Sequence, residues 1–112
     1  MKARNALLGA TPYQVEQGLR KLGGDLKTAR LRRNLTAEEA AQKIGTSRFA
    51  VADAEKGKRS TSVAVYAALL WAYGLIDRLA DVADPNSDEE GTRLALSRGP
   101  LRSRHRKLDN DF

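Results

Sequence analysis

The sequence predicts an all-α protein that consists of one small domain with an extension at each end. Three observations lead to this prediction. Apolar residues recur at intervals of three and four along much of the chain, which is the period of a helix. Capping residues and glycines stand where these stretches begin and end. Aromatic residues make up only 5% of the 112 residues while Ala and Leu are frequent, a composition that suits short packed helices.

The central feature is a pair of short helices between residues 36 and 58. Thr36 and Glu39 have the spacing of a capping box, in which a hydroxyl and a carboxylate each satisfy an unpaired backbone N–H. The first helix then carries a single apolar stripe, made of Ala37, Ala40, Ala41 and Ile44. This stripe predicts a helix with one buried face.

The turn between the two helices is expected at Gly45. Glycine adopts the left-handed conformation that ends a helix sharply, and side chains with a Cβ adopt it less easily. Thr46 or Ser47 then caps the second helix, which directs Val51 and Ala54 toward the first. The order of these residues predicts two helices joined by a tight turn.

Charge is distributed unevenly along the chain. The formal net charge is +6. Residues 1–60 hold 13 Lys and Arg against 6 Asp and Glu, whereas residues 61–97 hold 2 against 6 and residues 98–112 hold 5 against 2. Positive charge therefore gathers on the helix pair and on the C-terminal tail, as expected of a nucleic-acid-binding face. The alternative is a basic surface that serves only solubility.

The composition argues against several other classes of protein. There is no Cys and only one His, so a metal site, a disulfide framework and a cysteine nucleophile are not expected. We expect no catalytic residues and no cofactor, and hence not an enzyme. No apolar run approaches the roughly 20 residues of a membrane span. These features predict a cytoplasmic protein with no membrane partner.

Three residues of the helix pair carry a resemblance to a known family. Ala41, Gly45 and Val51 stand at the mutual spacing of a helix-turn-helix, and Glu55-x-Gly57 ends the unit. In this respect the chain resembles the phage-repressor (XRE) family. The resemblance implies a five-helix phage-repressor-like helix-turn-helix domain with an N-terminal helical extension and a C-terminal basic tail. The alternative is an ordinary helical hairpin of a bundle.

The resemblance also implies roles for individual residues. An arginine at the position of Arg30 pairs in this family with the glutamate that ends the recognition helix, here Glu55; two independent surface charges are the alternative. The expected base contacts come from the outward face of that helix, namely Arg48, Phe49, Ala52 and Asp53. Phosphate contacts are expected from Thr36, Thr46, Ser47, Lys56, Lys58 and Arg59. Family members commonly carry Gln where Ala37 stands, and this departure shifts the expected specificity onto the recognition helix.

The N-terminal part is expected to be an arm followed by a helix. Residues 1–10 lack periodicity. Thr11 is expected to cap a helix that begins near Pro12, because proline fits the first turn. Two interior glycines cost about 2 kcal/mol relative to alanine. The helix is therefore expected either to kink at Gly23-Gly24 or to restart with Asp25 as its cap.

The stretch from Val63 to Leu75 is apolar on every side of a helix. Such a helix needs partners all round, and one small domain does not supply them. We therefore expect a homodimer on a palindromic double-stranded DNA operator, with an interface at Tyr66, Leu70, Trp71 and Tyr73. The alternative is the central core helix of a monomer. A fifth helix is expected over residues 76–83, with Ile76, Leu79, Ala80 and Ala83 inward.

The last part of the chain is expected to hold a short helix and a basic tail. Ser87 and Glu90 have capping-box spacing, which predicts a helix from about Asp88 to Ser97. The tail carries Arg98, Arg102, Arg104, Arg106 and Lys107. The expected domain limits are 1–24 for the arm and extension, 25–84 for the helix-turn-helix domain, and 85–112 for the helix and tail.

The resemblance extends beyond the helix pair. The runs QGLRKLGGDLKTARLRRNLT and VYAALLWAYGLIDRLADVADP, with the DEEG that follows, are similar to HipB-type antitoxins. This implies a repressor that controls its own operon and neutralises a HipA-type Ser/Thr kinase toxin. A stand-alone transcriptional regulator is the alternative, and a non-specific nucleic-acid binder is another.

Overall fold

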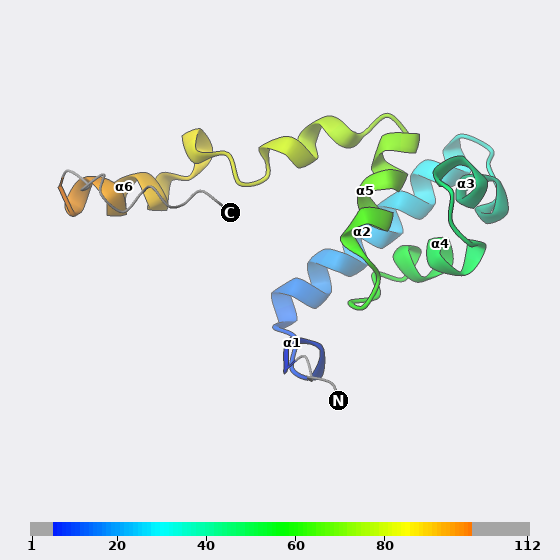
Figure 1. The fold of residues 1–112 in the computed structure, drawn as a ribbon, viewed down its shortest axis with the longest axis horizontal. Coiled ribbons are helices and arrows are strands. Elements are labelled where there is room, and N and C mark those ends of the chain that lie inside the picture. Colours follow the sequence, from blue (N-terminus) through cyan, green and yellow to red (C-terminus); the bar gives the residue numbers. More distant parts are fainter. Residues whose placement is uncertain (1–5, 100–112) are drawn as a thin grey trace. The chain divides into compact units, whose positions relative to one another are not determined.

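The computed structural model describes residues 6–99, and every regular element in this range is helical (Figure 1). The all-α prediction is confirmed. The elements are α1 (Ala6–Gly9), α2 (Tyr13–Arg32), α3 (Ala37–Ile44), α4 (Arg48–Glu55), α5 (Val63–Ala72), the 3-10 helices η1 (Ile76–Asp81) and η2 (Pro85–Ser87), and α6 (Glu89–Ser97). The chain divides into two compact units after Leu79.

Helix α2 is one continuous helix of 20 residues. The expected restart with Asp25 as a cap is therefore wrong. The expected cap at Thr11 is also wrong, because Pro12 occupies the N-cap position and the Thr11 hydroxyl donates instead to the carbonyl of Leu7, 2.7 Å away. That carbonyl belongs to α1, a short helix within the stretch that was expected to be an irregular arm.

The two glycines of α2 have different surroundings, which explains why the helix continues through them. A Cβ at Gly23 would lie 2.7 Å from the carbonyl oxygen of Glu55 and 2.7 Å from the amide nitrogen of Gly57. Gly24 has nothing within 4 Å of such an atom. Gly23 is thus required for the backbones of α2 and α4 to approach closely, and its packing offsets its low helix propensity.

Gly57 makes the reciprocal contact. A Cβ on this residue would lie 2.6 Å from the Cα of Arg20, and its φ of 71° is in the left-handed region. The loop after α4 therefore rests directly on the backbone of α2. Together, Gly23 and Gly57 hold the C-terminal end of α4 against α2.

The helix pair forms as its capping signals predict. The amide of Glu39 donates to Thr36 Oγ1 over 3.0 Å, and the amide of Thr36 donates to Glu39 Oε1 over 2.8 Å, so the capping box is complete. Gly45 ends α3 with a φ of 78°. Ser47 rather than Thr46 caps α4, and its hydroxyl oxygen accepts from the amide of Ala50.

The core lies around α4, which contacts α2, α3 and α5. Val51 and Ala54 are fully buried, and Ala40 and Ala41 of α3 are at most 1% exposed. These small side chains let α3 and α4 cross closely, so the expected stripe faces the core. The remaining core side chains come from α2, α5 and the end of α5, and they are Leu26, Ala29, Tyr66, Leu69 and Tyr73.

Two of the four residues expected at a dimer interface belong to this core. Tyr66 is 4% exposed and Tyr73 is 3% exposed within the single chain, so neither can form the outer surface of α5. The Tyr66 hydroxyl donates to the carbonyl of Lys58 over 2.8 Å, which ties the loop before α5 to the core. Leu70 is half-buried and Trp71 is 62% exposed, and these two retain a surface that a partner can cover.

The helix expected over residues 76–83 differs from the observed one. The observed element is the 3-10 helix η1, which ends at Asp81, and none of its apolar side chains is buried. Leu79 is 40% exposed, and Ala80 and Ala83 are also exposed; only Ile76 is half-buried. The expected inward face assumed an α-helix with 3.6 residues per turn. A 3-10 helix has three residues per turn, so the same side chains do not share one face.

The unit after Leu79 consists of the end of η1, η2 and α6. Asp88, not Ser87, caps α6, because its Oδ1 accepts from the amide of Gly91 over 2.9 Å. Asp84 caps η2 in the same way. Arg98 follows α6, whereas Arg102, Arg104, Arg106 and Lys107 lie outside the described residues. The domain limits at 24 and 84 stay a prediction, although α2 crosses the first without interruption.

The packing of α2 on α4 generates a prediction about its two glycines. Gly23→Ala is expected to lower the free energy of unfolding by about 1–3 kcal/mol, because the added methyl group overpacks the contact with α4. Gly24→Ala is the matched control and is expected to raise it by about 0.5–1 kcal/mol through helix propensity. Urea unfolding followed by far-UV circular dichroism measures both, and equal effects of the two substitutions would contradict the close approach at Gly23.

Candidate nucleic-acid interface

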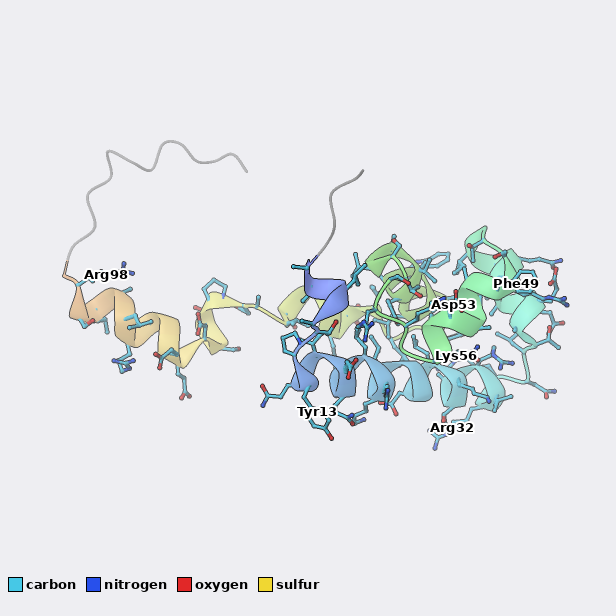
Figure 2. The ribbon with its side chains drawn as sticks, turned by 90° about the horizontal axis from the view of Figure 1, so that it is seen from below. Tyr13, Arg32, Phe49, Asp53, Lys56 and Arg98 are labelled. Atoms are coloured by element: carbon cyan, nitrogen blue, oxygen red, sulfur yellow. The ribbon has the colours of Figure 1, made fainter. Side chains whose placement is uncertain are left out.

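Helix α4 has a buried face and an exposed face, and both follow from its sequence. Val51 and Ala54 are completely buried, whereas Phe49 is 67% exposed and Arg48 is exposed beside it. Figure 2 labels Phe49 and Asp53 in α4 and Lys56 directly after its end. Arg48 and Phe49, at the start of the helix, are its most exposed side chains. The exposed face of α4 thus carries an aromatic ring and the cation Arg48, and Lys56 follows at the end of the helix.

Arg48 and Phe49 lie together at the N-terminal end of α4. The Arg48 guanidinium carbon is 5.1 Å from the centroid of the Phe49 ring, which is a cation–π distance. Stacking restricts the long arginine side chain while leaving its N–H donors accessible. An arginine in this state is suited to donate two hydrogen bonds to the edge of a guanine.

Ala52 and Asp53 are half-buried on the same helix. The Asp53 carboxylate lies 3.6 Å from Lys58 Nζ. Its partner is therefore a lysine in the following loop. The pair reduces the repulsion that a free carboxylate would exert on a DNA backbone.

The hydroxyls expected to contact phosphate lie at the two helix starts. Thr36 and Ser47 are exposed, and each accepts a backbone N–H as a cap. A hydroxyl that accepts in this way still has its own O–H to donate. Capping and a phosphate contact are thus compatible at both residues. Thr46 lies in the turn between them and is half-buried.

The loop after α4 carries three cations, Lys56, Lys58 and Arg59, and all three are exposed. Lys58 pairs with Asp53, and Arg59 donates to Oε2 of Glu16 in α2. Lys56 forms no ion pair with a described residue. The role of Glu16 was not predicted from the sequence, because no periodicity links two residues that are 43 positions apart.

The structure contains the ion pair expected between Arg30 and Glu55. Arg30 Nε donates to Glu55 Oε2 over 2.7 Å and Nη2 donates to Oε1 over 3.1 Å, with side-chain exposures of only 11% and 8%. Arg30 Nη1 also donates to the carbonyl of Leu35. Hydrogen bonding to Glu55 raises the pKa of Arg30, although burial opposes the shift. The pair fixes the last turn of α4 to the last turn of α2.

Arg33 makes a second connection between helices, which was not predicted from the sequence. Its guanidinium donates to the carbonyls of Ala29 and Tyr73, the latter over 2.8 Å, and lies 5.6 Å from the Tyr73 ring centroid. Arg33 therefore links the end of α2 to the end of α5. Burial raises the pKa of the Tyr73 hydroxyl, with a further contribution from Glu55. The cluster of arginines at the end of α2 is thus largely structural at Arg30 and Arg33.

Residues 6–99 contain no group of three or more His, Cys, Asp or Glu that could hold a metal ion. Within the same range no helix is long and apolar enough to cross a membrane.

Two short helices joined by a tight turn, with one face of the second helix exposed, are typical of helix-turn-helix proteins, a class of DNA-binding regulators in which the second helix lies in the major groove. A family model described as a helix-turn-helix domain matches residues 21–83, more than half of the chain. The chain therefore belongs to the helix-turn-helix domain family. Comparison with curated proteins and comparison with solved structures gave no match.

The buried ion pair generates a stability prediction. Glu55→Gln is expected to lower the free energy of unfolding by about 3 kcal/mol, because it leaves the Arg30 charge buried without a counter-charge. Asp25→Asn is the control, since it breaks the exposed Lys21–Asp25 pair of α2 and is expected to cost less than about 1 kcal/mol. Urea denaturation measures both variants. An effect of Glu55→Gln no larger than that of the control would mean that the pair does not anchor α4.

Proposed function

We propose that this protein is a cytoplasmic, sequence-specific transcriptional repressor of the XRE type that binds a palindromic operator in double-stranded DNA as a homodimer. The observation that carries the proposal is the exposed face of α4, where Arg48 and Phe49 stack at the helix N-terminus. In helix-turn-helix proteins this end of the second helix contacts base edges in the major groove. No catalytic step and no cofactor form part of the proposal.

The chemistry of the face favours base recognition over a purely electrostatic contact. A guanidinium donates to guanine O6 and N7, and an apolar ring suits the methyl group of thymine. Two neighbouring side chains on one helix therefore supply both kinds of contact. The hydroxyls of Thr36 and Ser47, with Lys56 in the loop, supply the phosphate contacts that set the helix in the groove.

Dimerisation is supported by the apolar surface that α5 leaves exposed. Trp71 is 62% exposed, Val63 is 74% exposed and Leu75 is 45% exposed, and Leu70 is half-buried. Exposed apolar side chains on α5, with Leu75 three residues beyond its end, are a feature that protein interfaces commonly show. A two-fold axis at this surface would present two copies of α4 to half-sites about 34 Å apart.

The narrower proposal is that the protein is the antitoxin of a type II toxin–antitoxin pair that neutralises a HipA-type Ser/Thr kinase. Its support is the similarity of the stretches around α2 and α5 to HipB-type antitoxins. A reading frame for such a kinase next to this one, with a product that copurifies with this protein, belongs only to the antitoxin version. A stand-alone regulator would have neither.

The test of the proposed function starts from a DNA sequence selected from a random duplex pool and from the promoter of the protein's own gene. Arg48→Ala is expected to weaken binding to the selected operator by about 1–3 kcal/mol and to relax the preference at one base pair per half-site. Lys56→Ala is the control and is expected to weaken binding to all sequences alike. Fluorescence anisotropy with single-base variants of the operator measures both.

Two results would contradict the proposal. If the wild-type protein binds selected and scrambled DNA equally, with the same salt dependence, it is a non-specific binder. If Arg48→Ala lowers the affinity for every DNA sequence by the same factor, Arg48 contacts phosphate. The assignment of base recognition to this end of α4 is then wrong.

The dimer generates a separate prediction. Trp71→Ala is expected to shift the protein toward monomer in sedimentation velocity without loss of helical content, because the ring is mostly outside the core of the single chain. Tyr13→Ala removes a side chain that is 72% exposed on α2 and is the control. An unchanged mass for Trp71→Ala would place the interface elsewhere.

A further inference from the structure

A hollow of about 340 Å³ is lined by the first half of α2, by the loop that follows α4 and by Leu8 of α1. Its walls carry the cations Arg20, Lys56, Lys58 and Arg59 and the single carboxylate Glu16. One of these cations and the carboxylate come from α2, and the other three cations come from the loop. Segments more than thirty residues apart in the sequence therefore place a concentrated positive charge around one cavity.

The four cations differ in what they already bind. Arg59 is held by Glu16, and Lys58 by Asp53, which lies outside the hollow. Neither Arg20 nor Lys56 forms an ion pair with a described residue. These two positive charges thus have no paired carboxylate among the described residues. The third, Arg59, is paired with Glu16 at the wall of the hollow, and the two side chains are 42% and 29% exposed. Exposed pairs of this kind contribute at most about 1 kcal/mol and exchange readily for another anion.

The walls are held in a fixed relation to each other by backbone packing. The loop backbone at Gly57 rests on the turn of α2 that carries Arg20, close enough that no side chain fits between them. The Tyr66 hydroxyl holds the same loop through the carbonyl of Lys58. The cations of the hollow therefore do not depend on a mobile loop for their position.

The hollow adjoins the end of α4 that is opposite to Arg48, because Lys56 and Gly57 line it and directly follow this helix. Helix α4 has 8 residues, so its two ends are separated by roughly 12 Å at a rise of about 1.5 Å per residue. The major groove is about 12 Å wide. A helix of this length that contacted base edges through Arg48 and crossed the groove would bring its other end, and the hollow beside it, to the edge of the groove where the sugar-phosphate backbone runs.

We propose that this hollow binds a backbone phosphate of the DNA next to the operator bases, and that Glu16 holds Arg59 there in the free protein until the phosphate replaces it. The inference rests on the proposed function and extends it to α2. The ligand is a phosphodiester, which accepts hydrogen bonds from Arg20, Lys56 and Arg59 together. In the free protein the carboxylate of Glu16 accepts from Arg59, and it therefore competes with the phosphodiester for this donor.

The test compares variants of α2 that differ only in their relation to the hollow. Arg20→Ala is expected to reduce affinity for the operator roughly five- to tenfold and to lower the slope of log affinity against log salt by about 0.9, the value for one phosphate contact. Glu16→Gln is expected to raise affinity roughly three- to tenfold. Both factors are expected to be the same for operator and unrelated DNA.

The Lys21–Asp25 pair supplies matched controls in the same helix. Lys21→Ala and Asp25→Asn change the formal charge by the same amounts as the two test variants, but neither residue lines the hollow. If each test variant behaves like its control while the wild-type protein still prefers its operator, the hollow is not a phosphate site. If the wild-type protein has no operator preference, it is the proposed function that fails.

A second measurement distinguishes the backbone phosphate from a free one. On duplexes trimmed to the operator bases, the effect of Arg20→Ala is expected to disappear, because the phosphate that it contacts has been removed. Titration calorimetry with inorganic phosphate and with ATP in the absence of DNA is expected to give no saturable binding. Saturable binding of either probe that Arg20→Ala abolishes would instead make the hollow a site for a free anion and would overturn the proposal.

Discussion

The attachment of the C-terminal end of α4 to α2 is the constraint on which the remaining structure depends. Gly23 and Gly57 let the two backbones touch, and the Arg30–Glu55 pair adds a bidentate contact at the end of both helices. A helix of eight residues is too short to be stable alone. Anchored at one end and packed through Val51, it presents its N-terminal residues to solvent in a single orientation. Figure 2 labels Tyr13 and Arg32, which mark the ends of the supporting helix α2.

The acidic residues beside the cationic face serve two different purposes because they differ in burial. Glu55 is almost completely buried with Arg30, and separating such a pair leaves a desolvated charge. Asp53 and Glu16 are paired at the surface, where the attraction is screened by water and a phosphate can replace a carboxylate. The Arg30–Glu55 pair thus holds α4 on α2. The Asp53–Lys58 and Glu16–Arg59 pairs reduce the repulsion between neighbouring cations at the surface.

Several features were not predicted correctly from the sequence, and the reason is the same in each case. A local pattern does not specify which distant residues pack against a given side chain. Two adjacent glycines predicted a break in α2, but Gly23 packs against α4 and the helix continues. Tyr66 and Tyr73 belong to an all-apolar stretch and were expected at an interface, yet they fill the core of the single chain. In both cases the deciding neighbour comes from a distant part of the sequence.

The sequence by itself determined the helix pair: the capping box at Thr36, the turn at Gly45 and the inward direction of Val51 all follow from interactions within a few residues. It also determined that positive charge gathers on the same segment. Only the tertiary structure decided that α2 and the loop after α4 form a common cationic hollow, and that Glu16 lies against Arg59. These contacts join positions 43 residues apart, and they depend on how the helices pack rather than on any spacing along the chain.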